Sequence, residues 1–290
     1  MSDFSSPLVT RYDLHCHTNA SDGDLSPIEI VERAIDMGIH VLSITDHDTC
    51  EGVMQAQQYL QQNARPLRLV NGVEISTLWE NIEIHIVGLN FSLSADSMVE
   101  LLEQQSALRL ERAIEIGRRL HKAGIPEAWE NATQISGGGQ VTRAHFAQYL
   151  IKIGKEKTIN NVFKRYLAKG KIGYVPAKWC TIDDAVKAIH NAGGVAVLAH
   201  PSKYQLSNKW LKRLVAYFKE CGGDAMEVSH CQQPANEKQY LAELAQNTDL
   251  KTSVGSDFHR PCSWIELGRN LWLPNDEQAV WLLWDEVKSV

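Results

Sequence analysis

Two periodicities of apolar and polar residues divide the first hundred residues into strands and helices. Residues 11–17 read as a strand, because Asp13, His15 and His17 recur at every second position and share one face. The segment Ser-Pro-Ile-Glu at 26–29 predicts a helix start, since it combines a serine cap, a proline in the first turn and a capping-box glutamate. Further elements are predicted in this part of the chain: strands near 41–45, 67–75 and 82–89, and a helix near 51–62.

The pattern changes at about residue 97 and changes back at about residue 175. The stretch between is helical with little strand, and the glycine-rich loop 136–139 interrupts it. Helices and strands then alternate again: helices near 182–191, 209–220 and 236–246, and strands near 195–199, 225–228 and 251–254. Repeated strand–helix units favour a parallel sheet that is closed or nearly closed into a barrel. We therefore expect an α/β fold with one barrel domain (residues 1–100 and 176–290) and an inserted, mostly helical cap subdomain (residues 101–175).

Histidines and carboxylates concentrate at the ends of the predicted strands. Because the carboxyl ends of barrel strands meet at one mouth, residues that are far apart in the sequence are expected to converge there. His85 is placed differently, since it lies within a strand and alternates with isoleucines. The residues concerned are His15, His17, Asp22, Asp46, His47, Asp48, Glu74, His85, His200, Glu227, His230, Asp257 and His259.

Each of these residues alone has an ordinary structural explanation. A His-x-His pair is more often two surface or core histidines than a metal site, and His85 could be a core histidine with a satisfied hydrogen bond. Five or more strand ends would each need a separate explanation, however, so the cluster as a whole indicates a metal site. Neutral imidazole and carboxylate suit manganese, iron and zinc, and the absence of cysteine among these residues disfavours a structural zinc site.

Composition and charge exclude several classes of protein. No apolar run approaches the roughly 18–20 residues of a membrane span, and the N-terminus lacks the pattern of a secretory signal. The six cysteines are scattered without a C-x-x-C pair, so we expect reduced thiols in a cytoplasmic protein.

The formal net charge is −6, yet residues 101–180 carry 14 Lys and Arg against 6 Asp and Glu. This basic segment predicts a surface that meets polyanions, with a solvated helical face as the alternative.

Six motifs in this order resemble those of the PHP (polymerase and histidinol phosphatase) superfamily: DLHCHTNASDG, LSITDHD, NGVEIS, EIHIVGL, VLAHP and GSDFH. The resemblance spans nearly the whole chain. It implies a distorted (β/α)7 barrel that holds three metal ions. Mn²⁺ is the ion we expect, and Fe²⁺, Zn²⁺ and Mg²⁺ are alternatives.

Carried over position by position, the resemblance implies a ligand set for each ion. Nine positions are involved: His15, His17, Glu74 and Asp257 for the first ion, Glu74, His85 and His200 for the second, and Asp22, His47 and His259 for the third. Every one of the nine holds a side chain that can bind a metal, so the implied site is intact. Asp46 and Asp48 are expected to orient imidazoles rather than to bind metal.

The inserted segment and the motifs QVTRAH, GYVPAKWCT and PCSWIELGR resemble one branch of this family, and this resemblance implies the reaction of that branch. That branch removes the 3'-phosphate of nucleoside 3',5'-bisphosphates and degrades short RNA from its 5' end to 5'-mononucleotides. We expect direct attack by a metal-activated hydroxide that bridges the ions, with Glu74, Asp257 and His200 as the catalytic residues. Nucleoside bisphosphates and RNA 5' ends are the expected substrates.

Five further residues are predicted to bind the substrate. Arg143 and His145 stand at a helix start after the glycine-rich loop, and Lys178 stands where the chain re-enters the barrel. A guanidinium suits a second, non-reacting phosphate. Glu227 and His230 lie near the mouth, where they either bind substrate or have a purely structural role.

Three other functions stay open. A phosphatase for a small monoester such as histidinol phosphate is possible, but the basic insertion argues against so small a substrate. A non-catalytic PHP module that stabilises a polymerase-like partner is disfavoured by the intact ligands. An amidohydrolase often uses a carboxylated lysine, and we find no lysine at a strand end for that role. We expect no membrane association and no obligate protein partner.

Overall fold

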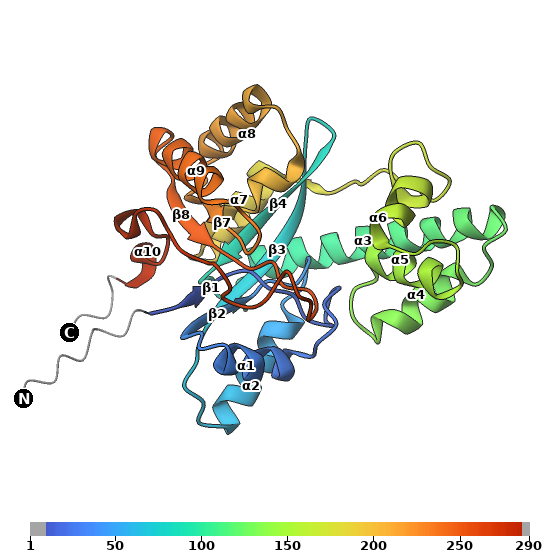
Figure 1. The fold of residues 1–290 in the computed structure, drawn as a ribbon, viewed down its shortest axis with the longest axis horizontal. Coiled ribbons are helices and arrows are strands. Elements are labelled where there is room, and N and C mark those ends of the chain that lie inside the picture. The colour runs from blue at the N-terminus through green and yellow to red at the C-terminus, as the bar shows by residue number, and fades with distance from the viewer. Residues whose placement is uncertain (1–9, 286–290) are drawn as a thin grey trace, which may run out of the picture.

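The computed structural model describes residues 10–285 and shows a barrel-like sheet surrounded by helices, with a helical lobe (residues 113–175) at one side (Figure 1). The strands span Tyr12–Asp13 (β1), Val41–Ile44 (β2), Arg68–Trp79 (β3), Ile82–Leu89 (β4), Cys180–Thr181 (β5), Val195–Leu198 (β6), Ala225–Ser229 (β7) and Lys251–Val254 (β8). Seven of them follow the order β1-β2-β3-β4-β6-β7-β8, and β5 pairs with β3 beside this path. The barrel nearly closes beyond β1 and β8, where Leu14 donates its N–H to Val254 and Asp257 donates its N–H to His15. The predicted α/β barrel is confirmed.

Helices connect most of the strands and cover the outside of the sheet. They span Pro27–Asp36 (α1), Glu51–Gln62 (α2), Asp96–Lys122 (α3), Ala128–Ser136 (α4), Arg143–Lys152 (α5), Ile159–Val162 (α6), Ile182–Asn191 (α7), Asn208–Glu220 (α8), Ala235–Asn247 (α9) and Leu282–Asp285 (α10), with short turns at Phe163–Leu167 (η1), Pro201–Tyr204 (η2) and Asp276–Gln278 (η3). Ser26 and Glu29 form the predicted capping box at the start of α1. None of the helices within residues 10–285 combines the length and apolar character that a membrane span requires. The cytoplasmic location stays a prediction.

The sheet is mixed, whereas we expected a parallel one. β3 continues past the predicted end at residue 75 and turns at Glu80 and Asn81, whose φ angles of 50° and 61° are left-handed. The chain then returns as β4, which is antiparallel to both β3 and β6. This two-residue connection has no room for the crossover helix that a parallel neighbour requires. The other pairs along the path are parallel, as expected.

Regular pairing ends early in β1, which is shorter than the predicted strand 11–17. Beyond Asp13 the chain bonds to both of its neighbours in turn. Cys16 accepts the N–H of Thr45 after β2, and His17 donates its N–H to the carbonyl of Phe258 after β8. The segment is therefore held in place by two strands, which fixes the histidines on it although it is not a regular strand.

The barrel and the lobe each have a hydrophobic core. In the barrel, Val73 and Ile75 of β3 pack with buried residues of β6, α7 and α8. In the lobe, Phe146 and Leu150 of α5 pack with Leu120 of α3. The two cores share no residue, so each part buries its own apolar side chains.

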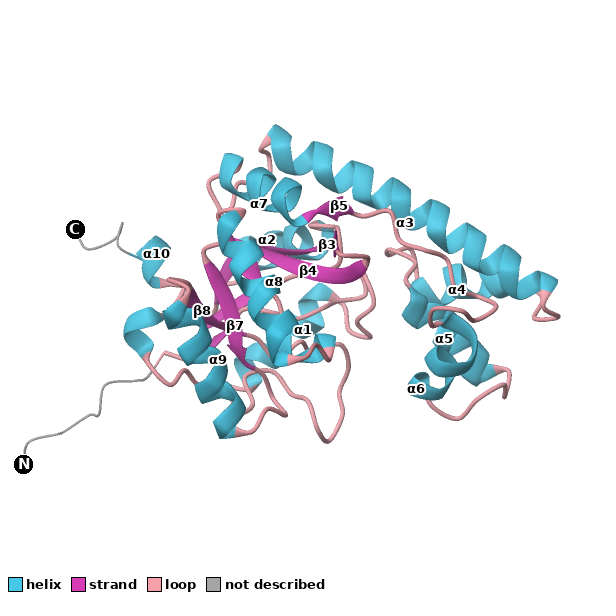
Figure 2. Cartoon of the chain, turned by 90° about the horizontal axis from the view of Figure 1, so that it is seen from above, coloured by secondary structure: helices cyan, strands magenta, loops and turns pink. Residues whose placement is uncertain are grey.

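The helix α3 joins the lobe to the barrel (Figure 2). It begins beside the barrel and runs out to the lobe, where α4, α5 and α6 lie against its far part. The predicted boundary at residue 101 falls inside this helix, and the division into barrel domain and cap subdomain stays a prediction. The glycine-rich loop then returns to the barrel. Gly139 lies so close to the carbonyls of Asn19 and Ala20 that a Cβ would collide with them.

Candidate metal centre

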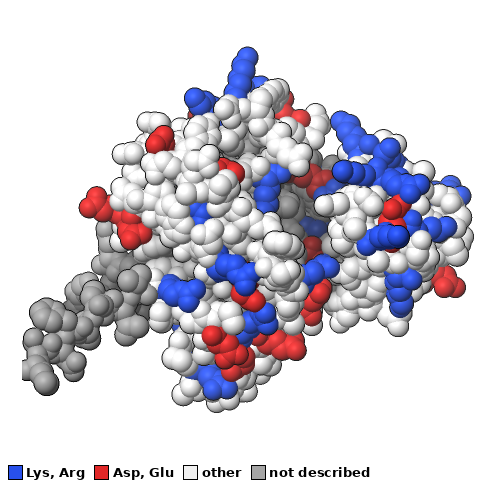
Figure 3. Space-filling model, in the orientation of Figure 1, with Lys and Arg blue, Asp and Glu red and all other residues white. Residues whose placement is uncertain are grey.

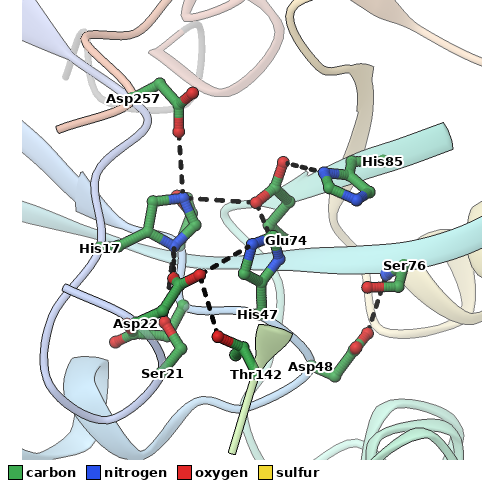
Figure 4. Close-up of polar contacts among 12 residues, drawn as sticks. His17, Ser21, Asp22, His47, Asp48, Glu74, Ser76, His85, Thr142 and Asp257 are labelled. Atoms are coloured by element: carbon green, nitrogen blue, oxygen red, sulfur yellow. Dashed lines mark hydrogen bonds and ion pairs between the residues drawn. The ribbon is translucent and has the colours of Figure 1, made fainter. Parts of the chain in front are cut away.

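Glu74 lies at the centre of a group of buried and half-buried histidines and carboxylates at the mouth of the barrel (Figure 4). Its Oε1 atom lies 2.8 Å from Nδ1 of His85 and 2.9 Å from Nε2 of His200. Its Oε2 atom lies 3.0 Å from Nδ1 of His47 and 3.3 Å from Nε2 of His17. Since β3 carries Glu74, β4 carries His85, and His200 follows β6, the structure brings together residues from across the sequence.

His15, His17 and Asp257 form one side of this group. The two Nε2 atoms of the histidines are 3.1 Å apart, and Oδ1 of Asp257 lies 3.5 Å from that of His15 and 3.2 Å from that of His17. Two ring nitrogens at this distance cannot both carry a proton, because the two N–H groups would point at each other. At least one imidazole therefore presents a lone pair.

Asp22 and His259 form the opposite side. Oδ1 of Asp22 lies 3.4 Å from Nε2 of His259 and 3.8 Å from Nδ1 of His17, and its Oδ2 lies 3.9 Å from Nε2 of His47. The hydroxyl of Thr142, at the N-cap of α5, lies 3.4 Å from Oδ2 of the same carboxylate. The lobe therefore contacts the centre directly.

The ionised carboxylates of this group suit the binding of cations. Burial would raise the pKa of Asp22, Glu74 and Asp257, but neighbouring positive groups hold the pKa of each carboxyl well below its usual value. Burial lowers the pKa of His47 to about 3, so this imidazole is neutral. His259 has a pKa raised to about 9 despite its burial, because the carboxylates of Asp22 and Asp257 lie beside it. A proton on His259 and a metal ion would therefore compete for the same carboxylates.

Several buried polar atoms in the group have no hydrogen-bond partner among residues 10–285: Oδ1 of Asp22, Nδ1 of His47, Oε2 of Glu74 and Nδ1 of His200. Buried polar groups are rarely left unsatisfied, so their concentration at one place indicates a ligand that satisfies them. All nine predicted ligands belong to four sets whose donor atoms lie within 4.8 Å of one another: His17, Asp22, His47 and His259; His15, His17 and Asp257; His15, Glu74 and His200; and His47, Glu74 and His85. This donor chemistry fits several divalent cations of the manganese, iron and zinc class.

Glu227, on β7, is engaged behind the imidazoles. Its Oε1 atom lies 2.7 Å from Nδ1 of His15, and its Oε2 atom accepts the backbone N–H of His200 at 2.7 Å. A carboxylate on the second nitrogen of a histidine fixes the tautomer and orientation of the ring. Both oxygens are thus taken by protein groups, and the predicted contact of Glu227 with substrate stays untested.

Asp46 and Asp48 have different partners from those expected. Asp46 accepts from the backbone N–H of Thr18 at 2.7 Å and from its hydroxyl at 2.6 Å. Asp48 accepts the N–H of Ser76 at 2.8 Å and pairs with the guanidinium of Arg109. Neither carboxylate hydrogen-bonds directly to an imidazole within the described part of the chain, and our prediction that they orient imidazoles was wrong for Asp48. Asp46 reaches an imidazole through Ser21, whose hydroxyl donates to Asp46 at 2.6 Å and lies 3.5 Å from Nδ1 of His17. The two carboxylates also hold the loops and the helix α3 in place.

A cavity of about 110 Å³ lies between the metal centre and the lobe. Residues of both parts line it, including Asp22, His47 and His85 from the centre and Arg109, Arg112, Arg143, Phe163 and Trp179 from or beside the lobe. Glu83, also in the lining, lies 2.7 Å from the guanidinium of Arg112 and 3.0 Å from that of Arg143. Burial opposes the ionisation of Glu83, but the two guanidinium groups lower its pKa to about 2.

Of the predicted substrate-binding residues, Arg143 alone lines this cavity. His145 accepts the backbone N–H of Thr142 through Nδ1 at 3.0 Å and so caps the start of α5. Lys178 is exposed on the segment that leads to β5. His230 is half-buried, with Nε2 3.4 Å from the hydroxyl of Ser202. The predicted contacts of these residues with substrate stay untested.

Three charged residues at the site carry no signal that our sequence analysis used. Arg109 and Arg112 lie in the middle of α3, where nothing local distinguishes them from residues of a solvated helix. Lys203 lies in η2, three residues after His200, and its ammonium donates to Oδ2 of Asp257. Our sequence analysis found no lysine at a strand end. The structure brings Lys203 to the mouth because the turn that follows β6 folds back over it. The position of Lys203 so soon after a predicted ligand could have identified it.

The chain is similar to proteins of two named activities. Over 289 residues it is 54% identical to the 5'-3' exoribonuclease Rnm of Escherichia coli (strain K12), covering 100% of this chain and 98% of that protein. Over 254 residues it is 36% identical to the 3',5'-nucleoside bisphosphate phosphatase of Chromobacterium violaceum, covering 87% and 88% of the two chains.

A solved structure and a family model extend the comparison. The structure of a Chromobacterium violaceum protein described as an amidohydrolase, with bound sulfate and no metal, matches with a TM-score of 0.87 and 34% identity, over 94% of this chain and 95% of that one. The family model for the PHP domain matches residues 13–218, which hold seven of the nine predicted ligands. Its match, the barrel and the full-length relatives agree: the chain belongs to the PHP domain family.

Proposed function

We propose that this chain is a metal-dependent phosphoesterase that removes the 3'-phosphate of nucleoside 3',5'-bisphosphates and degrades short RNA 5' to 3' into 5'-mononucleotides. One observation carries the proposal: the cluster of nine metal-binding side chains opens onto a cavity lined by three arginines. Divalent cations suit the first group, and phosphate suits the second. The exoribonuclease at 54% identity and the bisphosphate phosphatase at 36% identity support this choice of substrates.

We assign the nine residues to three ions, for which Mn²⁺ is our choice and Fe²⁺, Zn²⁺ and Mg²⁺ are alternatives. The proposed sets are His15, His17, Glu74 and Asp257 for the first ion, Glu74, His85 and His200 for the second, and Asp22, His47 and His259 for the third. The close approach of Glu74 to four imidazoles supports its place as the shared ligand. When bound, such ions polarise phosphoryl oxygens and acidify water.

The chain's own residues then hold the reacting groups in place. Glu227 orients His15 through its Nδ1 atom and ties the backbone of His200 to the same carboxylate. Lys203, paired with Asp257, places an ammonium beside this ligand. These contacts support rigid placement of the ligands that we consider catalytic, namely Glu74, Asp257 and His200.

The arginine side of the cavity is our candidate for the second, non-reacting phosphate. Three guanidinium groups there share two carboxylates: Arg109 pairs with Asp48, while Arg112 and Arg143 both pair with Glu83. This leaves one positive charge without a carboxylate of its own, and a phosphate would supply one. We assign that phosphate to Arg143 first, since its guanidinium makes a single contact with Glu83.

The alternative functions are less well supported. A histidinol phosphate phosphatase needs no second phosphate site, and a non-catalytic module needs no intact set of ligands. The solved relative described as an amidohydrolase raises C–N hydrolysis again, and Lys203 lies at the mouth. Its ammonium donates to Asp257, however, and is not placed between ligands as a carboxylated lysine would be.

The test is release of phosphate and nucleotide from 3',5'-bisphosphoadenosine and from a 5'-phosphorylated RNA oligomer, in Mn²⁺, by wild type and Asp257→Asn. We expect wild type to hydrolyse both substrates and the variant to lose most of its activity on each. Asp249→Asn is the matched control and should stay active, because this exposed carboxylate pairs with Lys219 and is not one of the proposed ligands.

Each outcome has a defined meaning. Hydrolysis of both substrates by wild type and control, but not by Asp257→Asn, supports the proposal. Hydrolysis of neither, with activity on histidinol phosphate or on an amide, would overturn it in favour of the corresponding alternative.

A further inference from the structure

A dense group of lysines covers the lobe next to the cavity. Residues 152–178 contain eight Lys and Arg and one acidic residue, Glu156, which leaves 21 Lys and Arg against 34 Asp and Glu in the rest of the chain. We call this group the insertion cations: Lys152, Lys155, Lys157, Lys164, Arg165, Lys169, Lys171 and Lys178. All eight are exposed, and Figure 3 shows Lys and Arg gathered over the lobe with few carboxylates among them.

The charges of this group are almost entirely unpaired. Arg165 forms an ion pair with Glu156, and none of the seven lysine ammonium groups has an ion pair or hydrogen bond with residues 10–285. The exposed part of α3 differs, since Arg118 and Arg119 both pair with Glu115. A solvated helical face typically mixes both signs in this way, whereas a cluster of one sign repels itself and raises the local potential. The charge pattern therefore favours a polyanion site over a solvated face.

The insertion cations begin at the edge of the cavity. Phe163 lines the cavity and is followed by Lys164 and Arg165, and Trp179 lines it and is preceded by Lys178. The ion pair between Arg165 and Glu156 connects this part of η1 to the lysine-rich loop 153–158. A chain of phosphates that leaves the cavity on the lobe side would thus meet these cations.

The cavity is small for a nucleic acid. Its volume of about 110 Å³ is well below the roughly 300–1,000 Å³ of typical ligand pockets, so it has room for only the terminal part of an RNA. The nucleotides beyond that part must lie outside the cavity. A mononucleotide bisphosphate has no such extension.

We propose that the insertion cations bind the phosphates of the RNA downstream of the nucleotide being removed. This rests on the proposed function of the metal centre and adds a second site, which contributes affinity for RNA and none for a nucleoside bisphosphate. The binding is electrostatic and independent of sequence, because lysines contact phosphates without reading bases. The lobe would thus increase the affinity of the catalytic centre for RNA without changing its affinity for nucleoside bisphosphates.

The test compares two sets of four substitutions. The first, Lys155→Gln, Lys157→Gln, Lys169→Gln and Lys171→Gln, removes charge from two lobe loops and leaves the cavity lining intact. The matched control removes four charges from α7 and α8: Lys187→Gln, Lys209→Gln, Lys212→Gln and Lys219→Gln. The substrates are 3',5'-bisphosphoadenosine and a 5'-phosphorylated RNA of about 12 nucleotides, a length within known single-strand sites.

We expect the lobe variant to lose on the order of 10–100-fold in kcat/KM on the RNA at low salt, with unchanged kcat/KM on the bisphosphate. For the RNA, the slope of log kcat/KM against log salt concentration should be shallower in the lobe variant than in wild type by up to about 3. Each of the four lost phosphate contacts removes about 0.7 from this slope. The control variant should retain wild-type kcat/KM on both substrates. Equal losses on both substrates, or an equal loss of RNA hydrolysis in the control, would overturn the proposal.

A binding measurement keeps this test separate from that of the catalytic function. The fluorescence anisotropy of a 3'-labelled RNA of the same length, in EDTA, gives the Kd for RNA without any hydrolysis. Weaker binding by the lobe variant than by the control supports the proposal even if neither substrate is hydrolysed. Equal binding by the two variants overturns it, whatever the catalytic function is.

Discussion

Glu227 contacts two of the proposed ligands at once, the ring of His15 and the backbone of His200. The position of Glu227 in the sequence does not predict these contacts, because they join segments that are far apart along the chain: β7, the end of β6 and the segment after β1. The same carboxylate is 4% exposed, so it has little direct access to a substrate. These contacts favour a role for Glu227 in positioning the ligands over direct contact with substrate. The two roles have different kinetic consequences.

We predict that Glu227→Gln weakens the binding of Mn²⁺ by about 10–100-fold, because an amide orients His15 less firmly than a carboxylate. Activity should then recover as Mn²⁺ is raised, since the ligands themselves are intact. The measurement is the initial rate of hydrolysis as a function of Mn²⁺ concentration, for the variant and wild type.

Glu243→Gln, an exposed change on α9, is the matched control and should show the wild-type Mn²⁺ dependence. A role of Glu227 in substrate binding would appear as a raised KM with unchanged Mn²⁺ dependence. That result would contradict the positioning role and favour our original interpretation of this residue.

Lys238 is a buried charge remote from the metal centre. Its ammonium donates to the carbonyl of Asn270 and lies 4.8 Å from the centre of the Trp272 ring. Burial lowers its pKa from 10.5 to about 8. Below pH 8 the amine is charged in both the folded and the unfolded chain, so its contribution to stability does not vary there. Between pH 8 and 10.5 the unfolded chain binds more protons, and the folded state gains stability as pH rises.

We therefore predict that wild type gains stability relative to Lys238→Met between pH 8 and 10.5, by up to about 3 kcal/mol. The free energy of unfolding in urea, measured for both proteins in EDTA across this range, tests the prediction. Lys209→Met is the control, since the ammonium of Lys209 stays in water in the folded chain. A pH-independent difference between wild type and Lys238→Met would rule out the buried charge as the cause.

Among the elements, α3 connects the two parts of the molecule and is anchored by side chains near its middle. Arg109 pairs with Asp48 and also donates to the hydroxyl of Ser76 at 2.7 Å. Gln105 donates to the carbonyl of Ser76 at 2.6 Å and accepts the N–H of Cys180 at 3.0 Å. These buried bonds join the helix to β3 and β5, and thereby set the position of the lobe over the mouth.

We predict that Arg109→Met destabilises the fold by about 3–5 kcal/mol, because it leaves the carboxylate of Asp48 buried and unpaired. Asp48→Asn combined with Arg109→Met should cost less than the sum of the single changes. Unfolding in urea, in EDTA, measures these differences without a contribution from bound metal.

Arg118→Met, on the same helix, is the control for this prediction. Its side chain is 51% exposed and pairs with Glu115 in water, so little change in stability is expected. Equal free energies of unfolding for the two variants would show that the buried pair does not anchor α3.

For the whole molecule, the metal centre is also a determinant of stability. It concentrates three ionised carboxyls, Asp22, Glu74 and Asp257, in a buried space together with imidazoles that leave several polar atoms unsatisfied. Its residues come from nearly every strand of the barrel. Cations bound there would hold the two halves of the sheet together and bind the folded chain only.

We predict that Mn²⁺ raises the Tm of the protein, relative to EDTA, by on the order of 5 °C when it exceeds its Kd about 100-fold. Differential scanning calorimetry with and without Mn²⁺ measures this shift. Asp257→Asn should show a smaller rise, since it removes one negative ligand. The same Tm in EDTA and in saturating Mn²⁺ would contradict the prediction.

The sequence by itself determined the barrel and the identity of the residues at its mouth. Helices such as α2 and α7 begin and end at the predicted residues, because apolar spacing is a local property of the sequence. Most of the histidines and carboxylates at the mouth were recognised for a similar reason, because they follow predicted strands, and strand ends of a barrel meet whatever the details of packing. The choice of nine of them as ligands came from the resemblance to the PHP superfamily.

Only the tertiary structure decided which residues act together around that mouth. The antiparallel direction of β4, the pairing of Asp48 with Arg109 and the position of Glu227 behind His15 all depend on contacts between distant segments. Periodicity shows which face of an element is buried, but not what is packed against it. For the same reason, the sequence of α3 does not distinguish Arg109 and Arg112 from the arginines of a solvated helix. Only the structure shows that they are buried between the barrel and the lobe.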